Sequence, residues 1–487
     1  MRLVPSPALV KQALAGHSWL GLFVGAFMYL ICISGTIVVF YESVERWEQP
    51  AVPEYHTVDP QLAEQAFNEV MTNGTEITEH LYLMLPTTPI PRMVVATENT
   101  GWFVQPDGTL GETTRHDWTH LLTNLHLYLH LPITWGMIVV SLFGALLCGL
   151  IVSGFIAHPR IFKDAFALRW QGGGRLEQVD IHNRLSVWGA PFHLMIALTG
   201  AWFGLVLLVL ALIGAVKDQN PEEMIETVFG GEPTLEQDSR HVAIARALEQ
   251  MPGIAPEASP LYITVHDAGT PGQFMEVQAQ HPGRLIYSEN YRFDTSGNYL
   301  GKVGFSDGEA GKQAVYSVYR LHFGHFGGIA IKLLYAVLGL ALTVVSVTGI
   351  NIWLLRRKRQ DWINLAWPGF VWGTPVALAA TAITQTLLGL PSTALFWLLL
   401  LAAAGYGLRR GDPKATRRDL QALGAATLLL LLAGHVLRFG AAAFGPAALG
   451  VNLALLLTAA ALALLAWRQR PATQAQPHRF DQATDAA

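Results

Sequence analysis

The chain has 487 residues, of which 51% are hydrophobic and only 14% are charged. Soluble proteins have a charged fraction nearer a quarter, and the apolar residues here gather into runs of about 20, long enough to cross a bilayer. This composition excludes an ordinary soluble enzyme and predicts an α-helical integral membrane protein. The net charge of −4 says little, because charges in a membrane protein are interpreted by their position.

Eight apolar segments are long enough to be membrane spans. The predicted spans are 17–40, 133–157, 187–215, 328–355, 367–389, 391–408, 419–441 and 446–467. No small-x-small cleavage site follows the first run, so we expect a retained helix and not a signal peptide. Cys32 and Cys148 lie inside apolar runs, which favours free thiols over a disulfide.

The Lys and Arg residues of the connections gather on one side of the predicted membrane. They occur in the connection 158–186, after the fourth span at 356–359, after the sixth span at 409–418, and after the eighth span. Positively charged loops stay in the cytoplasm, so both termini are expected there. The polar tail 471–487 lacks periodicity and is predicted to be a disordered cytoplasmic segment.

Two long polar segments, 41–120 and 216–320, then fall outside the membrane. Each has a helical stretch followed by a hairpin that a Gly-containing turn closes, at 106–108 and at 294–297. We therefore predict two small α+β exported domains, one in each half. The expected order is membrane helix 1–40, exported domain 41–120, membrane helices 2 and 3 at 121–215, exported domain 216–320, membrane helix 321–360 and a four-helix C-terminal region 361–470.

One histidine pattern occurs twice. His17 opens an apolar helix that ends at Ser34-Gly35, and His182 opens one that ends at Thr199-Gly200. The intervals are equal, since 35 − 17 = 18 and 200 − 182 = 18. Eighteen helical residues span about 27 Å, close to the thickness of a bilayer core. Each histidine is therefore predicted at one membrane rim and each small-residue pair near the other.

The following helices repeat a second pattern. His126 and His130 precede Ser153-Gly154, and His322 and His325 precede Thr348-Gly349. Here too the intervals are equal, since 154 − 130 = 24 and 349 − 325 = 24. The sequence thus predicts a duplicated helix pair with histidines at both rims.

Three interpretations of these histidines stay open. A b-type haem needs one neutral imidazole from each of two facing helices at equal depth, which His17 and His182 satisfy near one rim and the two later clusters near the other. A metal ion or a proton relay is the second interpretation, because the clustered histidines are three or four residues apart and share a helix face. In the third, histidines at headgroup depth have no special role.

Two further histidines need separate treatment. His193 lies 11 residues beyond His182, about 16 Å deeper on a straight helix, and its counterpart in the first half is Met28. A His/Met ligand pair is one reading, and a hydrogen-bonding role is favoured over it. His435, in the last four spans, is interpreted as a helix-packing or pocket histidine.

Four motifs in this order resemble a known family. They are His17-x-Trp-x-Gly21, Leu125-His126, Asp180-x-His182-Asn183 and Leu321-His322-Phe-Gly324, each leading to a Ser/Thr-Gly pair. They are similar to the PepSY-associated transmembrane helix proteins, which include iron-regulated inner-membrane proteins and ferric-siderophore reductases of Gram-negative bacteria. The resemblance covers about residues 10–360, and the exported segments resemble the PepSY modules of that family.

The resemblance implies a bacterial inner-membrane oxidoreductase with one or two haem b groups, which passes electrons across the membrane to a ferric siderophore. The family's motif histidines match His17, His182, His126 and His322, expected to bind haem iron. His130, His325 and His193 are further candidate cofactor-binding residues, and no catalytic residue is assigned.

The electron donor is expected to be an external quinol or flavin, because four apolar helices stand where some relatives have a flavin reductase domain. The partners are then a ferric siderophore, the lipid bilayer and this donor, and no nucleic acid. The alternative is a non-enzymatic membrane scaffold or permease whose exported domains bind a periplasmic partner.

Overall fold

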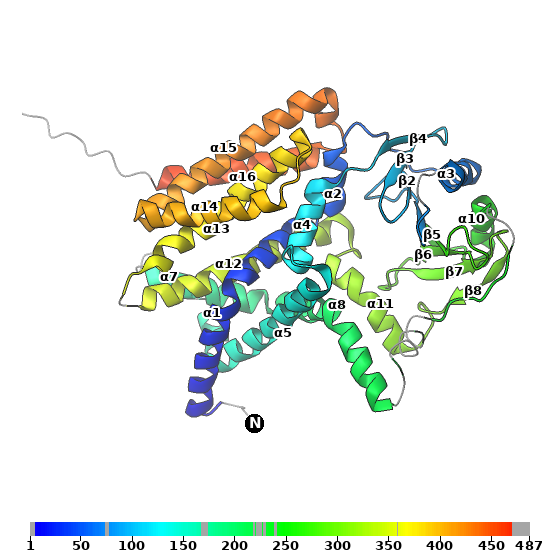
Figure 1. The fold of residues 1–487 in the computed structure, drawn as a ribbon. Helices are drawn as coiled ribbons and strands as arrows, with labels where there is room; N and C mark the ends of the chain where they lie inside the picture. The colour runs from blue at the N-terminus through cyan, green and yellow to red at the C-terminus, as the bar shows by residue number, and fades with distance from the viewer. Residues whose placement is uncertain are drawn as a thin grey trace, which may run out of the picture.

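The computed structural model describes residues 5–73, 77–166, 174–217, 220, 226, 230–237, 241–357 and 359–469. A bundle of long helices forms most of the structure, and one antiparallel sheet lies beside it (Figure 1). The last four long helices pack on the part of the bundle that is turned away from the sheet (Figure 1).

The two halves of the bundle have matching helices. The first half contains α1 (Pro7–Val38), α2 (Tyr41–Glu48), α4 (Asp117–Tyr128) and α5 (Ile133–Ala157). The second contains α7 (Gly174–Trp188), α8 (Ala190–Lys217), α11 (Ala310–Phe323) and α12 (Gly328–Arg356), and the short helix α6 (Ile161–Asp164) lies between the halves. Helix α1 packs on both α5 and α12, so the two halves share one hydrophobic core.

The C-terminal region is a further group of antiparallel helices. It consists of α13 (Trp362–Ala382), the π-helical turn η1 (Ile383–Leu387), α14 (Thr393–Arg410), α15 (Pro413–Phe439), the 3₁₀ turn η2 (Gly440–Phe444) and α16 (Leu449–Arg468). Helix α13 packs on α14 and α15, and α15 packs on α16.

Five helices of the described chain are long and apolar enough to cross a membrane. They are α1, α5, α12, α15 continued by η2, and α16, and the bent pair of α7 and α8 makes a sixth. Six of the eight predicted spans thus correspond to such helices. The other two, 367–389 and 391–408, form α13 with η1 and α14, which fall outside this group.

The second copy of the histidine pattern is not a straight helix. Helices α7 and α8 meet at 70° at Gly189. Pro191 follows in the first turn of α8, where a residue without an N–H group is tolerated but cannot continue a preceding helix. The prediction that His182 and Gly200 lie at the two ends of one straight helix is therefore wrong, and the predicted connection 158–186 contains most of α7.

The two segments that were predicted to be exported form one sheet and not two separate domains. Its order is β4-β3-β2-β1-β5-β6-β7-β8, and all its pairings are antiparallel. The strands are β1 (Leu81–Met84), β2 (Met93–Ala96), β3 (Gly101–Val104), β4 (Leu110–Thr113), β5 (Ser259–His266), β6 (Phe274–Gln280), β7 (Glu289–Phe293) and β8 (Tyr299–Val303). The pairing of β1 with β5, which places Leu83 beside Ile263, joins the halves.

A single core explains this joining. Helices α3 (Pro60–Asn73) and α10 (Ile244–Ile254), one from each segment, pack together and share a core with the sheet. The strands of the first segment have only four residues each, too short to bury a core alone, and their pairing removes two exposed sheet edges. Both predicted hairpins are present, with Gly108 and Gly297 at positive φ.

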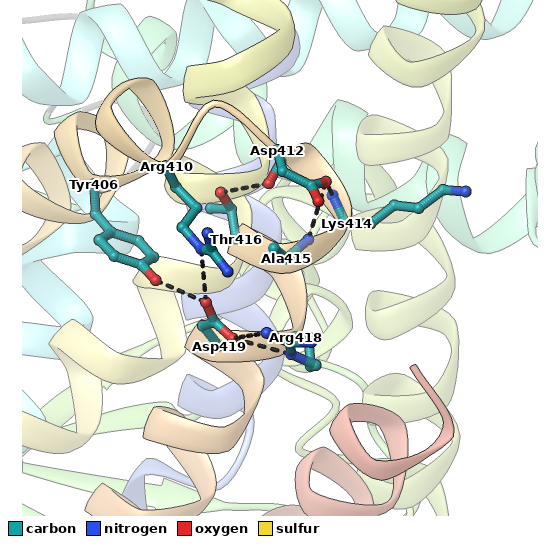
Figure 2. Close-up of polar contacts among 8 residues, drawn as sticks. All are labelled: Tyr406, Arg410, Asp412, Lys414, Ala415, Thr416, Arg418 and Asp419. Carbon is teal, nitrogen blue, oxygen red and sulfur yellow. Dashed lines mark hydrogen bonds and ion pairs between the residues drawn. The ribbon is translucent and has the colours of Figure 1, made fainter. Parts of the chain in front are cut away.

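The turn between α14 and α15 is fixed by two aspartates (Figure 2). Asp412 caps α15 by accepting hydrogen bonds from the backbone N–H groups of Lys414 and Ala415. Asp419 accepts hydrogen bonds from the Tyr406 hydroxyl and from Arg410 and Arg418. These contacts order a turn that is rich in basic residues.

Candidate functional site

Two pairs of histidines face each other across the halves of the bundle. In the N-terminal pair, the ring centres of His17 on α1 and His182 on α7 are 6.4 Å apart and the ring planes are at 85°. In the sheet-side pair, His126 on α4 and His322 on α11 are 6.1 Å apart and at 35°. Each pair takes one histidine from each half. The equal spacings predicted the pairing of His17 with His182. At the other rim they matched His130 with His325, and only the motif resemblance selected His126 and His322.

The Nδ1 atom of each paired histidine is hydrogen-bonded to an oxygen of a neighbouring helix. The contacts are His17 to the Leu150 carbonyl (3.0 Å), His182 to the Val345 carbonyl (3.1 Å), His126 to the Ile31 carbonyl (2.8 Å) and His322 to the Thr199 hydroxyl (2.8 Å). A carbonyl oxygen only accepts, so Nδ1 carries the proton in the first three. The Thr199 hydroxyl donates to the Met195 carbonyl, so His322 also donates through Nδ1. All four rings therefore keep a free lone pair on Nε2, the form that binds a metal.

Each paired histidine docks on one of the repeated Ser/Thr-Gly pairs. His126 lies against Ser34-Gly35, His17 against Ser153-Gly154, His322 against Thr199-Gly200 and His182 against Thr348-Gly349. In three cases the accepting carbonyl belongs to the residue three positions before the Ser or Thr. The glycine leaves space for the ring, since a Cβ atom on Gly154 would lie 3.2 Å from His17 Cε1. From the sequence alone, these Ser/Thr-Gly pairs were interpreted only as markers of helix ends. Their repeated spacing from the histidines was the signal that could have identified them as docking positions for the rings.

Each pair also lines a cavity. The cavity at the N-terminal pair measures about 390 Å³, and the one at the sheet-side pair about 120 Å³. Met28, Leu147 and Leu342 line both cavities and form the wall between them. Arg175 and Arg356 also line the N-terminal cavity, and no sequence motif selected them for a site.

The spacing of both pairs fits a haem held by two histidines. A metal–imidazole bond is about 2 Å long and the ring centre lies roughly 1 Å beyond the nitrogen, so two imidazoles on one iron stand roughly 6 Å apart. The observed separations of 6.4 and 6.1 Å match this value. Phe203 and Phe323 line the smaller, sheet-side cavity, and both rings contact His322.

His130 does not belong to this site, which corrects the expectation that it binds a cofactor. Its Nε2 lies 2.9 Å from the Leu121 carbonyl oxygen, and its Nδ1 lies 3.1 Å from the indole nitrogen of Trp397. A carbonyl accepts and an indole N–H donates, so both ring nitrogens are used. Residues Leu129 and His130 have positive φ and turn this ring away from His126, so the helical i, i+4 relationship does not hold.

The other two candidate histidines occupy different positions. His325 lies outside both cavities, with its Nε2 3.6 Å from Glu42, which also forms an ion pair with Lys332. His193 is only 2% exposed and lines the N-terminal cavity. Its Nε2 lies 3.4 Å from the Leu338 carbonyl oxygen, which favours the hydrogen-bonding role.

The metal-ion interpretation finds no site in the described part of the chain. No group of three or more His, Cys, Asp or Glu side chains there is arranged to hold a metal ion. Cys32 and Cys148 are free thiols. His435 is fully buried among helices, where it contacts Trp47 and Asn452, in agreement with a packing role.

The chain is similar to known proteins over the region that contains both histidine pairs. The model of the PepSY-associated TM region matches residues 14–356. An uncharacterised protein of Pseudomonas aeruginosa is 28% identical over 388 residues, which cover 74% of this chain and 96% of that protein. Both histidine pairs and the whole sheet lie within residues 14–356, whereas α13 to α16 lie beyond them. The chain therefore belongs to the family of proteins that carry the PepSY-associated TM region.

Proposed function

We propose that this protein is a haem-b oxidoreductase of the bacterial inner membrane that passes electrons across the membrane and reduces a ferric siderophore. The observation that supports the proposal most strongly is the geometry of the two histidine pairs. Both have the ring separation of a bis-histidine iron site, and both keep Nε2 free because Nδ1 is hydrogen-bonded. When bound, haem b supplies one-electron oxidation and reduction.

The positions of the two pairs support electron transfer from one side of the membrane to the other. His17 lies near the start of α1, whereas His126 docks at Gly35 near its end. The side chains of Met28, Leu147 and Leu342 separate the two cavities by a single wall. If Lys- and Arg-rich connections are cytoplasmic, the N-terminal pair is on the cytoplasmic side and the sheet is periplasmic.

Ring contacts lead from the sheet-side pair toward the sheet. His322 contacts Phe323 (5.6 Å between centres), Phe323 contacts Tyr319 (4.4 Å), and Tyr319 contacts Tyr287 (4.6 Å). Tyr287 in turn lies 6.5 Å from Tyr262 of β5. Closely packed rings favour electron tunnelling, which supports the sheet as the place where the ferric siderophore docks.

Reduction is an effective way to release siderophore iron. Hard oxygen ligands hold Fe³⁺ far more tightly than Fe²⁺, so transfer of one electron to the chelate weakens its hold on the metal. The chain needs to supply the haem ligands, their spacing and a docking surface. The exposed Arg175 and Arg356 side chains at the N-terminal cavity are suited to meet an anionic group of an external quinol or flavin donor, or of the haem itself.

A visible spectrum of the purified protein tests the proposal. Protein from haem-replete cells is expected to give b-type bands in a dithionite-reduced minus oxidised difference spectrum, and a ferric trihydroxamate is expected to reoxidise the reduced protein. A colourless protein would overturn the proposal and favour a scaffold or permease. A protein with b-type bands that the chelate fails to reoxidise would leave haem binding intact and rule out the substrate.

A further inference from the structure

Helix α4, which carries His126, is anchored at its first turn by α2. The carboxylate of Glu48 accepts hydrogen bonds from the backbone N–H groups of Trp118 (2.8 Å) and Thr119 (3.1 Å), and from the Thr119 hydroxyl (2.6 Å). Burial raises the pKa of Glu48 to about 7, and these hydrogen bonds act in the opposite direction. Glu48 therefore replaces the missing N-cap side chain of α4.

The C-terminal helices in turn hold α2. Trp47 is fully buried, and its ring stacks on His435 of α15 with centres 4.5 Å apart. Its indole N–H donates to Asn452 of α16 (2.8 Å), and its carbonyl oxygen accepts from His435 Nε2 (2.9 Å). The Trp47 backbone and side chain are thus both fixed by α15 and α16, next to the Glu48 cap.

The other end of α4 is held by α14. There the chain leaves the helix through two residues with positive φ, Leu129 and His130, a conformation that persists only where the surroundings impose it. His130 donates to the Leu121 carbonyl within α4 and accepts a hydrogen bond from the indole N–H of Trp397. The ring of His130 also contacts Phe396, which is fully buried.

We propose that the C-terminal helices α14 to α16 are a brace for α4, and that Trp47, His130, Trp397, His435 and Asn452 are positioning residues for His126. Contacts at both ends of α4 fix its axis and its rotation, which set the direction of the imidazole. The brace goes beyond the proposed function and does not require it. It gives a role to helices that lie outside the match to the family.

Two Trp→Phe substitutions form a matched test. Trp397→Phe removes the hydrogen bond to His130, whereas Trp367→Phe removes a similar hydrogen bond (2.9 Å) from α13 to Asn351 on α12. Both substitutions keep an aromatic ring, and each removes one indole N–H donor at the interface between the C-terminal helices and the bundle. Only the first contact reaches α4.

The first measurement is hydrogen–deuterium exchange of the full-length protein, with or without haem. Trp397→Phe is expected to speed exchange several-fold at residues 121–130, and Trp367→Phe is expected to leave these amides unchanged. Asn452→Ala tests the other end and should speed exchange at residues 118–121. Exchange across α4 in Trp397→Phe and Asn452→Ala that equals the wild-type rate would overturn the brace.

The second measurement is the low-spin EPR spectrum of haem-loaded protein, whose shape depends on the angle between the two imidazole planes. The sheet-side pair, at 35°, and the N-terminal pair, at 85°, are expected to give separate signals. Trp397→Phe should shift or reduce the sheet-side signal alone. An equal change in both signals would contradict a specific role in placing His126. If the protein binds no haem, the proposed function fails, while the exchange measurement still decides on the brace.

Discussion

The imidazole of His126 lies directly against Gly35 of α1. A Cβ atom at position 35 would stand 2.5 Å from His126 Cε1, closer than carbon atoms can approach without a shift. The docking of histidine on a Ser-Gly pair is reciprocal within the first half. His17 of α1 lies against Ser153-Gly154 of α5, and His126 of α4 lies against Ser34-Gly35 of α1. The second half repeats this exchange between α7 with α8 and α11 with α12.

Gly35→Ala is expected to displace His126 and to remove most of the haem at the sheet-side pair. Gly349→Ala is the matched control, because its Cβ atom would lie 3.4 Å from His182 Cε1, an ordinary contact. Haem content per protein, measured as the pyridine haemochrome, should fall by about half of the total in Gly35→Ala and stay near wild type in Gly349→Ala. Equal losses in both variants would contradict the steric explanation.

Single His→Ala substitutions should sort into two groups. His17→Ala and His182→Ala are expected to remove the same haem, because their rings face each other, and His126→Ala and His322→Ala the other one. His130→Ala should keep an iron-binding imidazole at both pairs, with at most a shifted sheet-side spectrum. Redox titration of each variant identifies which haem is lost. Loss of different haems in His17→Ala and His182→Ala would disprove the pairing.

Thr199→Val tests the hydrogen bond that orients His322. Valine has nearly the shape of threonine but cannot accept from His322 Nδ1, and loss of such outer hydrogen bonds typically weakens metal affinity about 10–100-fold. Thr374→Val is the control, since Thr374 is fully buried, its hydroxyl donates to the Phe370 carbonyl within α13, and it lines neither histidine cavity. Haem transfer to apomyoglobin measures the affinity. A wild-type transfer rate in Thr199→Val would show that this hydrogen bond is not needed.

Tyr319→Leu is expected to slow reoxidation of the reduced protein by a ferric trihydroxamate several-fold. The substitution removes one ring from the series of contacting aromatic rings between His322 and Tyr287. Tyr319→Phe keeps the ring and should retain the wild-type reoxidation rate. Stopped-flow absorbance at the reduced α-band gives these rates. Binding of the redox-inert gallium chelate, measured by calorimetry, separates an effect on docking from one on electron transfer. Equal reoxidation rates in Tyr319→Leu and Tyr319→Phe would show that the ring of residue 319 is not part of the electron path.

Acid should destabilise the region around the sheet through His116. Burial, with the nearby charges of His120 and Arg92, lowers the pKa of His116 to about 4. Because the unfolded chain binds this proton at its ordinary pKa, the stability is fully present above pH 6.5 and is lost as the pH falls toward 4, by up to roughly 3 kcal/mol. The midpoint of thermal unfolding should therefore fall less between pH 7 and pH 4.5 in His116→Gln than in wild type. The exposed His56, which is not among the groups that act on His116, supplies the control variant, His56→Gln. An unchanged pH dependence in His116→Gln would contradict the assignment.

The sequence by itself determined the membrane class, most of the helices and the four facing histidines. Apolar runs are local properties, so they identified six helices that are long and apolar enough to cross a membrane. The equal spacing placed His17 and His182 at matching positions, whereas His126 and His322 were selected by the motif resemblance and not by the spacing. The motif resemblance predicted the family that the match over residues 14–356 shows. The hairpins at Gly108 and Gly297 also followed from local turn chemistry.

Only the tertiary structure decided the contacts between segments that are distant in the chain. Strand pairing of β1 with β5 joined two predicted domains into one sheet, whose two segments share one hydrophobic core. The left-handed turn at Leu129 and His130 directs the His130 ring to a hydrogen bond with Trp397. The bend at Gly189 means that the second copy of the histidine pattern is not one straight helix. A periodic sequence fixes which residues share a helix face, but which neighbour that face meets depends on how the whole bundle packs.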